Sequence, residues 1–213
     1  MKEEEILLEL VERYPILKVC KEKIQCTYQI MKEGYQNGGK LLVAGNGGSA
    51  ADSDHIVGEL MKGFVKQRKL KKMEQKKILE INRELGEHLC RNLQQVLPAI
   101  SLTGHTALST AYLNDVDGTL GFAQQVYGYG KQGDIFLGIT TSGNSKNILN
   151  AVVVAKAKGL TTIALTGRDG GEVKDMADIS IIVPETETFK IQELHLPIYH
   201  TLCLMLEEHF FIS

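Results

Sequence analysis

Apolar residues repeat at helical spacing over the first 37 positions of the chain. They fall three or four positions apart, as they do on one face of a helix: Ile6, Leu7, Leu10, Val11, Tyr14, Val19, Ile24, Cys26, Ile30 and Met31. Pro15 interrupts this run, because proline lacks the backbone N–H that a helix interior uses. Gly34 and the Asn37-Gly-Gly39 cluster favour an end to the second segment. We therefore expect two amphipathic helices between residues 3 and 37.

Short apolar runs alternate with helical segments through the rest of the chain. We expect strands at residues 41–44, 99–103, 134–139, 161–165 and 179–183. We expect helices at residues 50–62, 106–113, 120–129, 146–157 and 188–211, the last with a possible bend at Pro197. This alternation is typical of an α/β sandwich with a mostly parallel sheet. No repeat or low-complexity linker divides residues 1–213, so we predict a single domain.

Residues 62–97 do not fit this alternation. The first half of the segment is rich in basic residues, namely Lys62, Lys66, Arg68, Lys69, Lys71, Lys72, Lys76 and Lys77. The second half has Leu85, Leu89, Leu93 and Val96 at helical spacing. We predict one or two helices inserted between the first two strands. A solvated helical hairpin is the favoured interpretation, and a basic lid that steers an anionic substrate is the alternative.

Composition and charge exclude several classes of function. The apolar fraction of 43% and the charged fraction of 23% are ordinary for a globular protein. The net charge of −2 gives no basic field for nucleic acid, and no apolar run approaches the roughly 18 residues of a membrane span. Cys20, Cys26, Cys90 and Cys203 form no CxxC pair, and the acidic N-terminus lacks a signal core. We expect a cytoplasmic protein with reduced thiols.

The first candidate binding loop, Gly45-Asn-Gly-Gly-Ser49, follows the first expected strand and precedes a helix. Backbone N–H groups at a helix N-terminus bind anions, and glycine lets the ligand approach closely. The loop matches a loose G-x-G-x-x-A pattern. The dinucleotide site also needs a second strand that ends in an acidic residue about 20 positions later, and the Lys-rich segment lies there instead. No Gly-Lys-Ser/Thr follows, so we favour a phosphate site over a nucleotide site.

The second candidate loop, Thr140-Thr-Ser-Gly-Asn-Ser145, follows the third expected strand. It offers four hydroxyls, one amide side chain and a helix N-terminus. Hydrogen bonds to a charged acceptor are each worth roughly 1.5–3 kcal/mol, so several of them can offset the desolvation of a phosphate. An ordinary helix cap uses one hydroxyl. Because the doubly wound strand order makes the first and third strands neighbours, both loops are expected at one edge of the sheet.

Two sets of polar residues are candidates for chemistry. His55 and Glu59 are four positions apart, so they share a helix face and can bind a divalent metal such as Zn²⁺, although a surface pair is the common alternative. In the last helix, Gln192 and His200 lie roughly 12 Å apart along the axis. One ion could bind both only with a bend, long side chains or a neighbouring subunit. His195 is interpreted as a hydrogen-bonded structural histidine.

Four motifs in this order resemble those of the sugar isomerase (SIS) family, and more narrowly its phosphoheptose isomerases: Leu42-Val-Ala-Gly-Asn-Gly-Gly-Ser49, Thr141-Ser-Gly-Asn-Ser145, Leu165-Thr-Gly-Arg-Asp-Gly-Gly171 and Ile191-Gln-Glu-Leu-His195. The resemblance covers nearly the whole chain except an insertion at about residues 65–97. It implies a five-stranded parallel flavodoxin-like sheet in a three-layer sandwich. It also implies a homotetramer with active sites where subunits meet.

The resemblance also implies roles for individual residues. The substrate-binding positions would be Asn46, Gly47, Gly48, Ser49, Asn114, Asp115, Thr140, Thr141, Ser142, Ser145 and Gln192. The ligands of zinc-containing members would be His55, Glu59, Gln192 and His200. Related non-catalytic members lack the second histidine, so His200 favours an enzyme. Phe189 stands where some members have an acidic residue.

The reaction that the resemblance implies is an aldose–ketose isomerisation of sedoheptulose 7-phosphate to a heptose 7-phosphate. A proton would move between C1 and C2, with Glu59 as base and His200 as acid. Two alternatives stay open. The chain could be a non-catalytic SIS protein that senses a phosphosugar or binds a partner, or it could isomerise another sugar phosphate.

Overall fold

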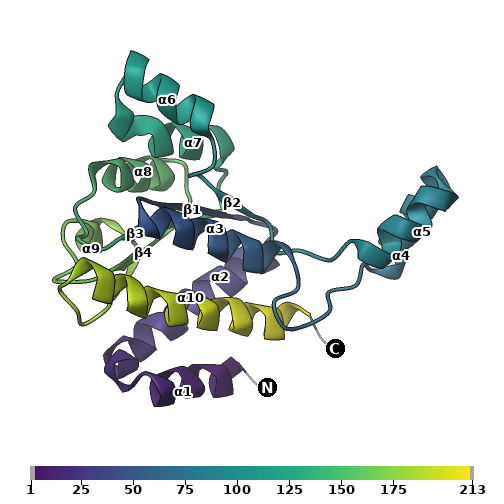
Figure 1. Ribbon diagram of the computed structural model, residues 1–213, viewed down its shortest axis with the longest axis horizontal. Coiled ribbons are helices and arrows are strands. Elements are labelled where there is room, and N and C mark those ends of the chain that lie inside the picture. Colours follow the sequence, from purple (N-terminus) through teal and green to yellow (C-terminus); the bar gives the residue numbers. More distant parts are fainter. Residues whose placement is uncertain (1–2, 212–213) are drawn as a thin grey trace.

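A parallel sheet of five strands lies at the centre of the computed structural model, which describes residues 3–211 (Figure 1). The strands are β1 (Leu41–Gly45), β2 (Ala99–Ser101), β3 (Ile135–Thr140), β4 (Thr161–Thr166) and β5 (Ile179–Ile182). Their spatial order is β2-β1-β3-β4-β5, which is the flavodoxin-like order. The α/β class and the pairing of β1 with β3, both predicted from the sequence, are confirmed.

Helices cover both faces of the sheet because successive strand residues point to opposite sides. Leu41 and Val43 pack in the core on one face, whereas Leu42 and Ala44 pack on the other. The first face is covered by α1 (Glu3–Arg13), α2 (Lys21–Gln36), α3 (Gly48–Met61) and α10 (Thr188–Phe210). The second face is covered by α7 (Gly121–Tyr129), α8 (Lys146–Ala157) and the short α9 (Val173–Met176). Within residues 3–211, no helix has both the length and the apolar character that crossing a membrane requires.

Several element boundaries differ from the expected ones. A 3-10 turn, η1 (Pro15–Cys20), separates α1 from α2 at the predicted break. Gly34 lies inside α2 and does not end it. A Cβ at this position would come within 2.6 Å of Ile135 on β3. The glycine therefore lets the helix pack closely on the sheet. The last helix is continuous through Pro197, and α3 begins at Gly48, two residues earlier than expected.

The predicted insertion forms a helical arm, which we define as α4 (Lys72–Ile81) and α5 (Arg83–Asn92). Its two helices pack against each other, and a bridge between Lys69 and Gln94 closes its base. The arm leaves from the C-terminal end of α3, whereas the first loop lies at the N-terminal end. Figure 1 shows it projecting away from the sheet and from the loops that follow β1 and β3. This geometry fits the predicted hairpin and does not place a lid over those loops of the same chain.

A buried ion pair anchors the segment that connects α3 to the arm. The Glu207 carboxylate accepts hydrogen bonds of 2.8–3.2 Å from the backbone N–H groups of residues 64–66. It also accepts one of 2.8 Å from Arg68 Nε, and both side chains are fully buried. The Arg68 guanidinium in turn donates to the carbonyls of Glu59 and Leu60 at the end of α3. These contacts hold the end of α3 against α10.

Replacing Glu207 with glutamine should destabilise the fold strongly. The Arg68 charge would stay buried without its counter-ion, and breaking such a pair by removing one partner costs about 3–5 kcal/mol. Urea unfolding measures this change. Glu208→Gln is the matched control, because it removes the neighbouring and more exposed contact with Lys66. Its free energy of unfolding should fall by about 1 kcal/mol or less. Equal losses in the two variants would contradict this account.

The difference in the free energy of unfolding between the wild type and Glu207→Gln should also depend on pH. Burial works to raise the pKa of Glu207, but the amides of Val65 and Phe64 and the Arg68 guanidinium outweigh it, so the pKa lies below its usual value. The folded state then binds fewer protons than the unfolded state, whose glutamate pKa is about 4.3. The stabilisation is present above that pH and is lost as the pH falls through the lowered pKa. The gap between the two unfolding free energies should therefore narrow in acid.

Candidate active site

The loops that follow β1 and β3 meet at the carboxyl edge of the sheet. Asn46, in the first loop, and Asn147, in the first turn of α8, exchange two side-chain hydrogen bonds of 3.0 and 2.8 Å. Strand pairing also brings the loops together, because Gly45 lies beside Ile139. The predicted convergence of both candidate phosphate loops is therefore confirmed.

The hydroxyls of the second loop are held in a compact turn. Thr140 Oγ1 and Ser145 Oγ lie 2.9 Å apart, and Ser142 Oγ accepts a hydrogen bond of 3.2 Å from the backbone N–H of Asn144. Thr141, Ser142 and Ser145 lie in the same turn, and Thr140 is 3% exposed. The turn leads into the start of α8, where the N-terminal N–H groups favour an anion.

Gly143 sets the shape of this turn. Its φ is +71°, a conformation that residues with a side chain rarely adopt. A Cβ at this position would lie 2.0 Å from the carbonyl oxygen of Gly170, in the loop that follows β4. The Gly143 carbonyl also accepts a hydrogen bond of 3.0 Å from the backbone N–H of Val173. The loops after β3 and β4 can pack this closely only with glycine here.

The first loop turns directly into α3. Gly47 has a φ of +57°, Gly48 is the first residue of the helix, and Ser49 is 3% exposed. A Cβ on Gly48 would lie 2.6 Å from Nε2 of Gln192, so the amide of this α10 residue lies against the N-terminus of α3. Gln192 is predicted both to bind substrate and to bind a metal, and this placement fits substrate binding at the candidate phosphate loop.

His55, Glu59 and His200 form a cluster farther along α3. Nε2 of His55 lies 3.3 Å from Oε1 of Glu59 and 3.4 Å from Nε2 of His200 on α10. The other carboxylate oxygen of Glu59 is 3.3 Å from Nζ of Lys62. The structure therefore brings together the predicted base, the predicted acid and one further predicted ligand, and it adds a cation that sequence reasoning missed.

Packing makes His200 less basic than a free histidine. Burial is the main cause of its lowered pKa, and the nearby His55 acts in the same direction. The carboxylate of Glu59 works to raise the pKa but does not offset the other two effects. The lowered pKa favours the neutral imidazole, which can bind a metal or donate its remaining N–H.

The cluster fits a zinc site in chemistry and in part of its geometry. Two ligands that lie about 2.0–2.1 Å from a tetrahedral Zn²⁺ are about 3.3–3.4 Å apart. The separations between His55 and Glu59 and between His55 and His200 match two edges of such a tetrahedron. Among residues 3–211, however, no three histidine, cysteine or acidic side chains are placed so that together they could hold a metal ion. Gln192 is the remaining predicted ligand.

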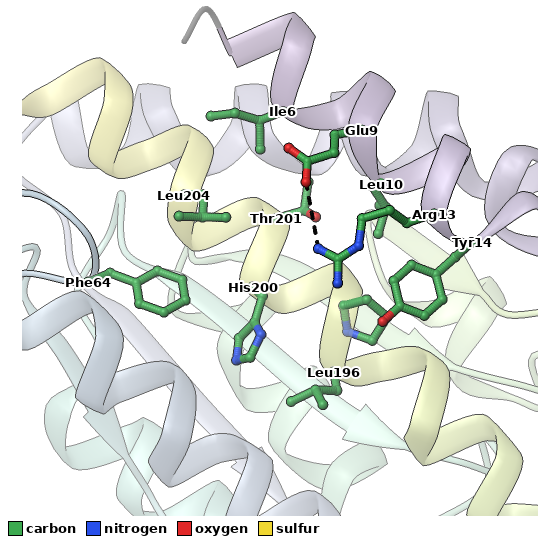
Figure 2. A pocket seen from close by; sticks show the side chains of 11 residues that line it. Ile6, Glu9, Leu10, Arg13, Tyr14, Phe64, Leu196, His200, Thr201 and Leu204 are labelled. Carbon is green, nitrogen blue, oxygen red and sulfur yellow. Dashed lines mark ion pairs between the residues drawn. The ribbon is translucent and has the colours of Figure 1, made fainter.

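A crevice of about 150 Å³ between α1 and α10 reaches His200 (Figure 2). In Figure 2 the His200 ring lies between Phe64 and Leu196, and Arg13 approaches from α1. The residues that line the crevice include none from the two phosphate loops. The crevice therefore lies beside the cluster and apart from the two candidate phosphate loops.

Other predicted residues lie outside this arrangement. Asn114 and Asp115 are exposed at the end of α6 (Thr106–Asp115), where the Asn114 amide donates to the Asp115 carboxylate over 2.7 Å. The helix α6 packs on α7 and on the turn η2 (Gly118–Leu120). The role of Asn114 and Asp115 in substrate binding stays a prediction.

His195 is fully buried, as expected of a structural histidine. Its Nε2 lies 3.3 Å from the Thr166 carbonyl oxygen, but its Nδ1 has no hydrogen-bond partner within residues 3–211. Burial lowers the pKa of His195 to about 4. The interpretation of His195 as a hydrogen-bonded structural histidine therefore holds for Nε2 and fails for Nδ1.

Comparisons with known proteins agree with the fold and with the loops. A family model described as the SIS domain matches residues 75–167. Phosphoheptose isomerases of a Nitratiruptor species and of Clostridium acetobutylicum are each 40% identical to this chain. These matches cover 84% and 89% of the chain and 81% and 84% of the relatives.

Two solved structures extend the likeness to three dimensions. Phosphoheptose isomerase from Neisseria gonorrhoeae superposes with a TM-score of 0.74 at 31% identity, covering 94% of each chain. The enzyme from Francisella tularensis gives a TM-score of 0.76 at 34% identity, covering 92% of this chain and 91% of that one. The sheet order and the two hydroxyl- and glycine-rich loops therefore define an SIS-domain protein. Within that class, the chain belongs to the phosphoheptose isomerase family.

Replacing Gly143 with alanine should weaken the binding of phosphate. The new Cβ cannot coexist with the Gly170 carbonyl, so the hydroxyl loop must shift and lose at least one charged hydrogen bond. Such a loss corresponds to a roughly 10- to 100-fold change in affinity, which calorimetric titration with inorganic phosphate can measure. Gly128→Ala is the control, because that position in α7 has open space around it. Unchanged affinity in Gly143→Ala would refute the assigned role of the loop.

Proposed function

We propose that this protein isomerises sedoheptulose 7-phosphate to D-glycero-D-manno-heptose 7-phosphate. The observation that carries the proposal is the arrangement along α3, which has the phosphate loop at its N-terminus and His55 and Glu59 later on the same helix. At 1.5 Å per residue, His55 lies about 10 Å along the axis from Gly48. This span suits a long, open-chain sugar phosphate that is held at its phosphate end and reacts at its other end.

The phosphate would be bound by the hydroxyls of Thr141, Ser142 and Ser145 and by backbone N–H groups at the starts of α3 and α8. These donors carry no net charge, so their strength comes from number and orientation. Holding the distant phosphate restricts the position of C1 and C2, which lowers the entropic part of the barrier. The amide of Gln192, which lies against Gly48, would contact the substrate near its phosphate end.

Glu59 would move the proton between carbons. It removes a proton from C1 of the ketose to give an enediol and returns a proton to C2, so that the carbonyl passes from C2 to C1. Oε1 of Glu59 faces His55, which leaves Oε2, beside Lys62, for this transfer. His200 would give a proton to the oxygen on C2 as the enediol forms and would take one from the hydroxyl on C1 as the enediol collapses, so that His200 is restored and protons balance over the reaction.

We further propose zinc as the cofactor, held by His55, Glu59 and His200. Gln192 is the fourth predicted ligand, but Gln192 of the same chain lies against Gly48, about 10 Å along α3 from His55, so the set would be completed from a neighbouring subunit. When bound, the ion supplies positive charge next to the oxygens on which negative charge develops. The donor types and the two tetrahedral edges support this assignment. The residues of the cluster would then serve both to bind the ion and to move protons.

A homotetramer that acts in the cytoplasm is part of the same proposal. The incomplete set of ligands within one chain and the open crevice beside His200 both leave room for groups of a neighbouring subunit. The four cysteines are free thiols, as a reducing compartment favours. Light scattering of the purified protein tests the assembly, and a stable, fully active monomer would overturn it.

Replacing Glu59 with glutamine should lower kcat for sedoheptulose 7-phosphate by about 10²- to 10⁴-fold, the usual contribution of a general acid–base group. KM should change little, because the phosphate loop is unaltered. Product formation followed by NMR measures both constants. Asp54→Asn is the matched control, since this carboxylate is on the same helix but accepts its hydrogen bond from Thr103.

The same assay separates the proposed function from its alternatives. Near-normal kcat in Glu59→Gln would remove Glu59 from the role of base. A wild-type protein that binds the sugar phosphate without turnover would be a non-catalytic SIS protein instead. Turnover of other ketose phosphates, but not of the heptose, would change the substrate and keep the reaction class.

A further inference from the structure

Behind the cluster lies a hydrogen-bonded group that the mechanism above does not use. The hydroxyl of Tyr199 on α10 lies 3.1 Å from Oδ1 of Asp52 and 3.1 Å from Nδ1 of His55. Asp52 and His55 are one turn apart on α3, so they face the same tyrosine. Tyr199 is 2% exposed, and Asp52 is half-buried. The group thus lies in the interface between the two helices that carry the cluster.

The hydroxyl of Tyr199 has one proton and two partners. When it donates that proton to the Asp52 carboxylate, its oxygen can only accept from His55, so Nδ1 must carry a hydrogen. A neutral imidazole has one N–H, and Nε2 is then left with a lone pair. Nε2 is the nitrogen that faces Glu59 and His200.

The direction of these hydrogen bonds depends on the charge of Asp52. Oδ2 of Asp52 is buried and makes no hydrogen bond within the described part of the chain, and burial raises the pKa of this carboxyl. The hydrogen bond from Tyr199 and the nearby His55 act in the opposite direction and favour the carboxylate that accepts from Tyr199. In the reverse arrangement, a protonated Asp52 would donate to Tyr199, and Nε2 of His55 would carry the hydrogen and could not bind a cation.

We propose that Asp52 and Tyr199 are positioning residues that hold His55 in the tautomer whose Nε2 binds the divalent cation. This inference rests on the proposed function, because it assumes that the cluster binds zinc. Neither residue touches the substrate or the ion. Their effect is on the orientation and basicity of the ligand, as is common for the partners of metal-bound histidines.

The edge-on packing of the rings supports the same role. The His55 ring meets Tyr199 at a centroid distance of 5.5 Å and an interplanar angle of 72°, and it meets His200 at 4.9 Å and 83°. Tyr199 and His200 are 5.0 Å apart at 89°. A phenylalanine at position 199 would keep these contacts and lose only the hydroxyl, so Tyr199→Phe isolates the hydrogen bond from the packing.

The test is the zinc affinity of the purified full-length protein, measured by competition with a chromogenic chelator. Tyr199→Phe should bind zinc about 10- to 100-fold more weakly, the usual effect of removing such a partner. Asp52→Asn should also weaken binding, because the anionic acceptor is lost. Tyr28→Phe is the matched control, since Tyr28 is another buried tyrosine that donates to a carboxylate, that of Glu3, and its loss should leave zinc affinity unchanged.

The possible outcomes separate this inference from the function it rests on. Tight zinc binding by the wild type and equal binding by Tyr199→Phe and Asp52→Asn would overturn the positioning role and leave the isomerase proposal intact. A wild type that binds no zinc would overturn both the zinc assignment and this inference, while its turnover would still be measured separately. Thermal unfolding of each variant identifies a loss of fold, and a misfolded Tyr199→Phe leaves Asp52→Asn to decide.

Discussion

The position of α3 against α10 is the constraint on which the whole site depends. The N-terminus of α3 lies at the candidate phosphate loops, its middle carries His55 and Glu59, and α10 supplies His200 and Gln192. Two buried polar contacts fix this pair of helices. The Arg68–Glu207 ion pair ties the end of α3 to α10, and Tyr199 joins α10 to the second turn of α3. Buried polar contacts of this kind favour this register between the helices, because a shift would leave a buried polar group without its partner.

Much of the fold and the first half of the site followed from sequence patterns. Apolar runs such as Leu41–Ala44 predict buried parallel strands, and the doubly wound order then makes the loop at Gly45 a neighbour of the loop at Thr140. The spacing of His55 and Glu59 predicts a shared helix face, which the 3.3 Å separation confirms. These features depend on local periodicity or on a general rule of topology, so a single sequence is enough to predict them.

The rest depends on contacts between segments far apart in the chain. Nothing local indicates that the amide of Gln192 lies against Gly48, or that Tyr199 lies between Asp52 and His55, because both facts depend on how α10 is rotated against α3. Lys62 looked like one member of a solvated basic run, and only the end of α3 places it beside Glu59. Gly34 likewise looked like a helix terminator until its close approach to Ile135 was visible.

The base of the helical arm has a consequence for how this protein can vary. The antiparallel bridge from Lys69 to Gln94 brings the entry and the exit of the arm side by side, at the end of α3 that lies farthest from the first loop. A segment whose two ends already meet can be lengthened, shortened or exchanged without stretching the chain on either side. The arm is therefore a natural place for new surface to be added in evolution, and for an affinity tag or a fused domain in the laboratory.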